Sequence, residues 1–145
     1  MGHRITKEGI FPDEAKVNAV KQMPTPNDKK DIQRFLGLIN YMGRFIPNLA
    51  EHSSPLRAML RKEVVFVWGD EQQRSFDCLK KIIVSDQCLA KYDVTKPVCI
   101  EVDACNTGLG AVLLQEDRPV AYASRSMTAK LCYHRKRTAR CGICM

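Results

Sequence analysis

The spacing of hydrophobic and polar positions changes near residue 90. Before that point apolar residues recur three and four positions apart, which is the spacing of a helix with one buried face. The clearest such stripe is Ile32, Phe35, Leu36 and Ile39. Beyond that point apolar and polar residues alternate, which is the period of a strand. The alternating residues are Val98, Ile100 and Val102 against Cys99, Glu101 and Asp103.

Prolines and capping residues divide the first part of the chain. Residues 2–6 are expected to form a short strand. Pro12 begins a helix that ends before Pro24, because proline suits a first helical position and the residue before a proline avoids helical angles. Asn27 is the expected N-cap of the next helix, which Pro47 closes.

The segment up to residue 90 contains two further expected helices. Residues 52–55 start a short one, and residues 64–68 form a β-branched and aromatic run typical of a strand. Asp70 with Gln73 three positions later matches a capping box, and the helix that follows buries Phe76.

The second part is expected to be an antiparallel meander. Residues 98–103, 110–114 and 119–123 read as three strands joined by short turns. No apolar period predicts a helix after Met127, so the domain is expected to end before the helices that would cover its sheet. The predicted fold class is α+β, with short helices followed by a three-stranded antiparallel meander. An uncovered meander also carries a risk of poor folding and aggregation.

Charge and cysteine are concentrated at the C-terminus. The 145-residue chain has a net charge of +7 and seven cysteines. Residues 129–145 contain five basic residues, no acidic residue and three of the cysteines, so the rest of the chain is close to neutral. No apolar run approaches the roughly 20 residues of a membrane span, and residues 1–10 have no signal-peptide core. We expect reduced thiols, an intracellular (cytoplasmic or nuclear) location, no secretion and no membrane partner.

Eight short segments, in order, resemble the polymerase–nuclease part of gypsy-type LTR retrotransposon Pol polyproteins. They lie within residues 2–128 and include Phe-Leu-Gly-Leu-Ile-Asn-Tyr at 35–41, Arg-Phe-Ile-Pro-Asn at 44–48, Val-Asp-Ala at 102–104 and Pro-Val-Ala-Tyr-Ala-Ser-Arg at 119–125. The resemblance implies three parts. Residues 1–90 are the end of a reverse transcriptase palm and its thumb/connection segment, and residues 91–128 are the N-terminal strands of an RNase H-like domain. Residues 129–145 are a basic, Cys-rich tail.

The chain departs from that family at two places. Cys105 stands where the family usually has serine. After Thr128 the family continues with a helix whose first Glu helps to bind metal, and this chain does not. Reading the permitted codons of residues 130–145 one base later allows that helix; Arg135 as AGA followed by Lys136 as AAA gives Glu. We therefore expect the tail to be out of frame and disordered.

The resemblance implies RNase H chemistry, in which carboxylates hold two Mg²⁺ ions that activate water and stabilise the leaving oxygen. Asp103 is the candidate catalytic residue and metal ligand. From spacing alone, a strand-end aspartate that caps a turn is the favoured interpretation. Glu101 lies on the same face of the strand, but two residues cannot replace a four-carboxylate cluster. The ancestral function is RNA-directed DNA synthesis and Mg²⁺-dependent cleavage of RNA in RNA–DNA hybrids, and this chain alone is predicted to be inactive, with no metal bound productively.

Four basic residues are candidates for nucleic-acid contact, namely Lys29, Lys30, Arg34 and Arg44. In the parent polyprotein their partner is an RNA–DNA hybrid or a template–primer duplex, and no small-molecule substrate is evident. The alternative is a solvated charged face, since Asp28 and Asp31 lie nearby. A second function remains open, that of a non-catalytic nucleic-acid-binding module that uses the helical half and the basic tail.

The tail also invites a zinc interpretation. Its four candidate ligands are Cys132, His134, Cys141 and Cys144. The spacing of the last two is suitable, but one intervening residue between the first two is too few for a structural zinc site. We expect no zinc there.

Overall fold

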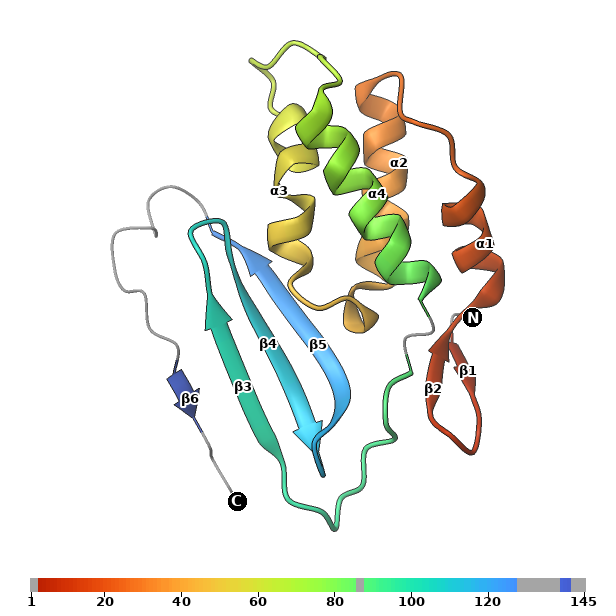
Figure 1. Ribbon diagram of the computed structural model, residues 1–145, viewed down its shortest axis with the longest axis vertical. Helices are drawn as coiled ribbons and strands as arrows, with labels where there is room; N and C mark the ends of the chain where they lie inside the picture. The colour runs from red at the N-terminus through yellow and green to blue at the C-terminus, as the bar shows by residue number, and fades with distance from the viewer. Residues whose placement is uncertain (1–2, 86–87, 128–138, 142–145) are drawn as a thin grey trace.

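The computed structural model describes residues 3–85, 88–127 and 139–141. A group of helices lies beside an antiparallel sheet, and a small hairpin lies near the N-terminus (Figure 1). The elements in order are β1 (His3–Ile5), β2 (Ile10–Pro12), α1 (Glu14–Gln22), α2 (Lys29–Tyr41), the 3₁₀ turn η1 (Gly43–Phe45), α3 (Leu49–Met59), α4 (Asp70–Val84), β3 (Cys99–Ala104), β4 (Gly108–Gln115), β5 (Arg118–Ser126) and β6 (Ala139–Cys141). The predicted α+β fold class is confirmed.

The hydrophobic core lies among the helices. α2 buries the predicted stripe of Ile32, Phe35, Leu36 and Ile39. Phe35 meets Phe76 of α4 with ring centroids 4.6 Å apart. α4 also buries Leu79 and Ile83, as its period predicts. Burial of these large side chains supplies most of the driving force for packing the helices together.

The starts of α1 and α2 differ from the predictions. Pro12 ends β2, and α1 begins after Asp13, whose carboxylate accepts a hydrogen bond from the Ala15 N–H at 3.0 Å. Asp28, not Asn27, caps α2 by accepting from the Asp31 N–H at 2.7 Å. The capping side chain must lie two or three residues before the N–H that it accepts from, and Asp28 meets that requirement for Asp31.

The segment from residue 47 to residue 73 departs furthest from the predictions. α2 ends at Tyr41, well before Pro47, and α3 begins at Leu49 and passes through Pro55. Gly69, not Asp70, is the N-cap of α4, and its N–H donates to Gln72 at 3.2 Å. Gln73 does not take part in this cap.

Residues 64–68 do not form the expected strand. Val65 and Val67 are 79% and 68% exposed, whereas Phe66 and Trp68 turn toward the helices. The Trp68 ring meets Phe76 edge to face, with ring centroids 5.9 Å apart. Exposed and packed side chains therefore alternate along residues 64–68, as they would in a strand. The segment is nevertheless a loop, and its two aromatic rings pack against the helices.

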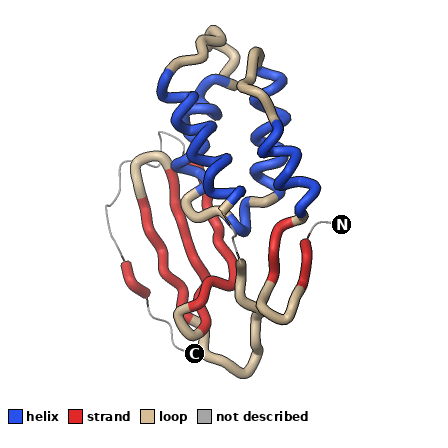
Figure 2. The backbone as a smooth tube through the Cα atoms, turned by 45° about the vertical axis from the view of Figure 1, so that its right-hand side comes forward, coloured by secondary structure: helices blue, strands red, loops and turns tan. Residues whose placement is uncertain are grey.

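The predicted meander is confirmed, and a fourth strand joins it. The strand order is β5-β4-β3-β6, and all pairs are antiparallel. Figure 2 shows these strands side by side, apart from the hairpin near the N-terminus. β6 comes from the tail and pairs Ala139–Cys141 with β3. A sheet edge offers unpaired backbone groups to any segment within reach, which accounts for this pairing. The remaining tail positions lie outside the described residues.

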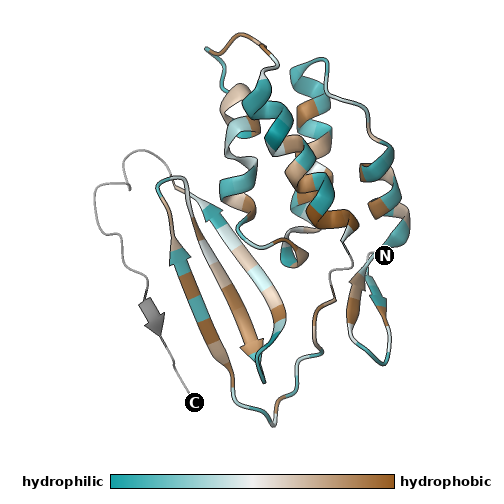
Figure 3. Ribbon diagram, in the orientation of Figure 1, coloured by the Kyte–Doolittle hydropathy of each residue, from teal (hydrophilic) through white to brown (hydrophobic). Residues whose placement is uncertain are grey.

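The two faces of the sheet have different surroundings. On one face the start of α3 packs against β4 and β5, and the Ala50 N–H donates to the Ser124 hydroxyl at 3.1 Å. On the other face Ile100, Val102 and Leu109 are 40%, 38% and 40% exposed. Figure 3 shows hydrophobic bands along β3 and β4. Within the described residues the second face is thus apolar and open to solvent.

Candidate nucleic-acid interface and carboxylate site

Asp103 lies near the end of β3, on the face that meets α3. It pairs in register with Gly110 of β4, which in turn pairs with Ser124 of β5. Its exposed carboxylate lines a small hollow whose other walls include Asn48 and Glu51 of the helical part. The site is therefore formed jointly by the sheet and the start of α3.

Two glycines allow this close approach. A Cβ atom on Gly110 would collide with Oδ1 of Asn48, and one on Gly108 would lie 2.7 Å from the Cβ of Ala50. Asn48 itself has the left-handed φ of 49°, a conformation that asparagine adopts more readily than most residues. The two glycines of the Gly-x-Gly sequence in β4 thus leave the space that the start of α3 occupies.

Glu51 is a carboxylate that the sequence reasoning did not identify. It is exposed on the first turn of α3 and lines the same hollow as Asp103. Within residues 3–85 and 88–127, no group of three His, Cys, Asp or Glu side chains is arranged to hold a metal ion. The described donors therefore do not fit a two-metal centre, although Asp103 and Glu51 share one hollow.

Cys105 takes part in the turn that follows β3. Its N–H donates to the Gly108 carbonyl at 2.9 Å, and its thiol lies 3.4 Å from the same oxygen and 3.2 Å from the Thr107 hydroxyl. A serine hydroxyl would make the same kind of contacts, so the Cys105 substitution preserves the turn beside Asp103.

The four predicted basic residues do not form one patch. Lys29 donates to the Arg61 carbonyl at 2.9 Å, and Arg34 pairs with Asp31 at 3.5 Å within α2. Lys30 is exposed near the same helix end. Arg44 follows the opposite end of α2, about 20 Å away along a helix of this length.

Arg44 lies instead in a groove between the helices and β5. Arg57 of α3 lines the same groove, and Arg125 of β5 borders it, but strand alternation places the Arg125 side chain on the sheet face opposite to that of Ser124. Arg57 is held by hydrogen bonds from Nε to Ser53 at 2.9 Å and from Nη2 to Asn40 at 2.8 Å. The sequence reasoning missed Arg57, because only tertiary packing brings it into one groove with Arg44.

His3 lies near Arg44, one of the residues that line this groove. Its ring contacts Phe45 and Tyr41, with centroids 5.1 and 5.9 Å apart. Burial, reinforced by the positive charge of Arg44, lowers the pKa of His3 below 6.5, and Asp13 partly opposes this effect. The neutral imidazole is therefore favoured in the folded state.

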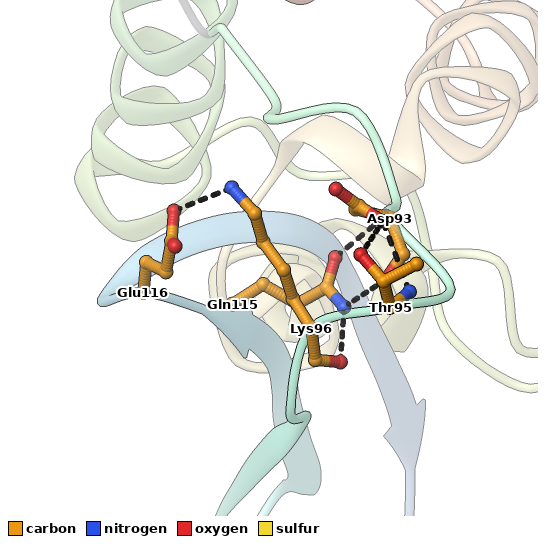
Figure 4. A network of polar contacts seen from close by, with 5 residues as sticks. All are labelled: Asp93, Thr95, Lys96, Gln115 and Glu116. Carbon is orange, nitrogen blue, oxygen red and sulfur yellow. Dashed lines mark hydrogen bonds and ion pairs between the residues drawn. The ribbon is translucent and has the colours of Figure 1, made fainter.

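A polar network holds the loop that leads into β3 (Figure 4). The buried amide of Gln115 accepts from the Asp93 N–H at 2.9 Å and donates to the carbonyls of Asp93 and Lys96 at 2.8 and 3.1 Å. Hydrogen bonds from Thr95 lower the pKa of Asp93. An ion pair of 2.8 Å between Lys96 and Glu116 closes the network. This loop fixes the start of the strand that carries Asp103.

Comparison with known proteins gives a consistent result. Residues 68–141 match the family described as the RNase H-like domain found in reverse transcriptase. The chain is 39% identical over 132 residues to the retrovirus-related Pol polyprotein from transposon 412 of Drosophila melanogaster, with 88% of this chain and 11% of that protein covered. It is 33% identical over 133 residues to the transposon Tf2-3 polyprotein of Schizosaccharomyces pombe, with 88% and 10% covered. The chain thus spans about a tenth of the length of these relatives.

Solved structures share the fold. A foamy viral protease-reverse transcriptase in complex with an RNA/DNA hybrid matches with a TM-score of 0.78 and 22% identity, over 92% of this chain and 19% of that one. The same kind of protein in complex with dsDNA matches with a TM-score of 0.76, over 92% of this chain and 29% of that one. Among the helices of the described ranges, none has the length and hydrophobicity needed to cross a bilayer.

Proposed function

Because this chain belongs to the family of RNase H-like domains found in reverse transcriptase, we propose that it is a nucleic-acid-holding segment of a retrotransposon Pol polyprotein. Its partner is an RNA–DNA hybrid or a template–primer duplex. The observation that carries this proposal is the fold match over 92% of the chain to a reverse transcriptase in complex with an RNA/DNA hybrid. In this proposal residues 1–90 are the palm end and thumb/connection segment, and residues 91–128 are the first strands of the RNase H-like domain.

The proposed contacts are electrostatic. Lys30 and Arg44 are exposed, and Lys29 and Arg34 lie close to Lys30 on the first turns of α2. Lysine and arginine contacts to phosphates release condensed counterions, so the affinity should fall steeply as salt rises. Fluorescence anisotropy of a labelled RNA–DNA hybrid, measured at several salt concentrations, tests this proposal. Binding that is absent at low salt would rule it out.

Catalysis is proposed as an ancestral role. Asp103 is the proposed metal-ligating carboxylate of the nuclease, but the described residues do not complete a two-metal centre, so we propose that the chain alone does not cleave hybrids. The test is incubation of a labelled hybrid with the purified chain in Mg²⁺. Cleavage that disappears in Asp103→Asn would contradict the proposed inactivity and would at the same time establish Asp103 as catalytic.

A second candidate is a binding module that depends on the tail, since residues 129–145 contain five basic residues and no acidic one. Replacing Arg135, Lys136 and Arg137 by glutamine in the full chain separates the two candidates. If affinity for the hybrid collapses in this variant but survives Lys30→Gln with Arg44→Gln, the tail is the main binding element. The opposite pattern assigns binding to the helical half.

The tail is also proposed to be read out of frame. The permitted codons after Thr128 allow the family's Tyr-Ala-x-Thr-Glu-Lys-Glu-Leu-Leu helix one base later, whereas the family match itself continues to residue 141. The nucleotide sequence from the Ser126 codon onward decides whether the tail is frameshifted or is a sequence of its own. If the shifted frame spells that helix, the frameshift is real; if it does not, the tail is a sequence of its own.

A further inference from the structure

Residues 64–68 have the sequence of a strand but lie in the loop that joins α3 to α4. The loop projects at the end of the helical part (Figure 1), and Figure 3 shows a hydrophobic stretch on it. We propose that this segment pairs antiparallel with the same segment of a second copy of the chain. This pairing needs neither nucleic acid nor the carboxylate site, so it is independent of the proposed function.

The backbone of the segment is extended and unpaired. The rings of Phe66 and Trp68 stack side by side with centroids 6.4 Å apart, whereas Val65 and Val67 are exposed. This alternation of side chains is typical of extended backbone. Among the described residues, no hydrogen bond involves the backbone N–H or C=O groups of residues 65–68. An extended segment with such groups is a template for a second strand.

The unpaired backbone groups favour one register. The Val64 N–H already donates to the Arg61 carbonyl at 3.3 Å. In an antiparallel pair the hydrogen-bonded positions alternate along each strand. Pairing Val65 with Val67 of the second copy therefore avoids the occupied N–H group. A two-fold axis beside Phe66 generates the same pair a second time, and the exposed valines of the two copies then cover one another.

The charges on either side of the segment suit the same register. Arg61 and Lys62 precede the segment, Asp70 and Glu71 follow it, and all of them are exposed. The register brings Lys62 near Asp70 of the second copy. It likewise brings Arg61 near Glu71 of the second copy. Parallel pairing in register would instead bring like charges together, which is unfavourable. The segment with its flanks is thus complementary to itself in the antiparallel sense.

The expected dimer is weak. A ribbon formed by residues 64–68 of each copy is much smaller than a stable interface, which buries roughly 1,200–2,000 Å². Sedimentation velocity at low salt, over a range of protein concentrations, therefore provides the test. We expect the wild type to shift from monomer toward dimer as the concentration rises.

Charge reversal tests the contact directly. Lys62→Glu and Asp70→Lys, each alone, bring like charges together at both symmetric contacts, so each should weaken the dimer about tenfold. An equimolar mixture of the two variants has opposite charges at both contacts and should regain the affinity of the wild type. Lys7→Glu, on the exposed turn of the N-terminal hairpin, changes the net charge equally and should have little effect.

Hydrogen exchange followed by NMR tests the register. The amides of Val65 and Val67 should exchange more slowly at high protein concentration than at low concentration. The amide of Phe66 points to the opposite edge of the segment, so its exchange rate should not depend on concentration. A circular dichroism melt of each variant confirms that the compared proteins are folded.

Three results would overturn the proposal. The first is a wild type that stays monomeric at every concentration. The second is a mixture of the two charge variants that associates no better than either variant alone. The third is a dimer that both charge variants retain and that Ile100→Thr with Val102→Thr abolishes, because this pattern places the contact on the open face of the sheet. Restored association in the mixture, with slowed exchange at Val65 and Val67, supports the proposed pairing.

Discussion

The hydroxyl of Ser124, near the end of the edge strand β5, caps a helix of the neighbouring part. It accepts a 3.1 Å hydrogen bond from the backbone N–H of Ala50, in the first turn of α3. First-turn N–H groups have no partner within their own helix, and the N-cap residue Asn48 makes no side-chain capping bond here. This hydrogen bond therefore joins the helical part to the RNase H-like sheet and at the same time caps the N-terminus of α3.

Ser124→Ala is expected to lower the free energy of unfolding by about 1 kcal/mol, the usual cost of losing a helix cap. Urea denaturation monitored by circular dichroism measures the change. Ser126→Ala is the matched control, since this serine lies on the same strand and is exposed. Equal effects of the two substitutions would show that the Ser124 bond has no capping role.

Gly110→Ala tests the contact between β4 and α3. The new Cβ would collide with Asn48, so we expect a loss of about 1–3 kcal/mol, typical of overpacking. Gly37→Ala is the control, because nothing lies within 4 Å of a Cβ there and it sits inside α2. That control should gain about 0.5–1 kcal/mol from helix propensity.

A second substitution identifies the cause of the loss at Gly110. Asn48→Gly removes the colliding side chain and suits the left-handed backbone at φ 49°. The double variant should therefore recover most of the stability lost in Gly110→Ala, as measured by the same urea titration. Additive losses in the double variant would mean that the Asn48 side chain is not the obstacle.

Short-range periodicity was sufficient to predict most of the elements. The buried stripe of α2 and the three strands of the meander follow from spacings within a dozen residues, and both are confirmed. Residues 64–68 have an equally strong local pattern, yet they pair with no strand in the described part of the chain. Their aromatic residues pack on α4 instead, so tertiary contact overrides β propensity.

The site depended on contacts that local patterns do not encode. Glu51 shares a hollow with Asp103, and Arg57 lies in one groove with Arg44, only because α3 packs on β4 and β5. The nearest local signal was the Gly-x-Gly of β4, since glycines in a strand often mark close approach of another backbone. That signal predicts a contact at Gly110 but does not say which helix makes it.

Gln115→Leu is expected to destabilise the loop before β3. The leucine fills a similar volume but leaves the Asp93 N–H and the carbonyls of Asp93 and Lys96 without the partners that the amide supplies. Unsatisfied polar groups of this kind cost about 1–3 kcal/mol. Urea denaturation gives the total loss, and hydrogen exchange at the Asp93 amide localises it. Glu116→Gln, which removes only an exposed ion pair, should have a much smaller effect.

The uncovered face of the sheet predicts self-association. Ile100 and Val102 are exposed on neighbouring positions of one face of β3, and exposed apolar patches on strands favour aggregation. Replacing both by threonine keeps β-branched side chains while reducing apolar surface. We expect less light scattering at the same protein concentration and little change in the melting temperature. Unchanged light scattering would show that this face of the sheet is not the cause of self-association.

His3 provides a pH-dependent test of the geometry around Arg44. Its folded-state pKa lies below 6.5, with burial as the larger cause and Arg44 as the next, so the unfolded chain binds more protons in that window. The contribution of His3 to stability is therefore complete above pH 6.5 and is lost as the pH falls below it. His3→Phe should flatten this part of the pH profile of the unfolding free energy. Arg44→Gln should raise the pKa of His3 in an NMR titration, and a pKa that stays the same would show that the two side chains are not electrostatically coupled.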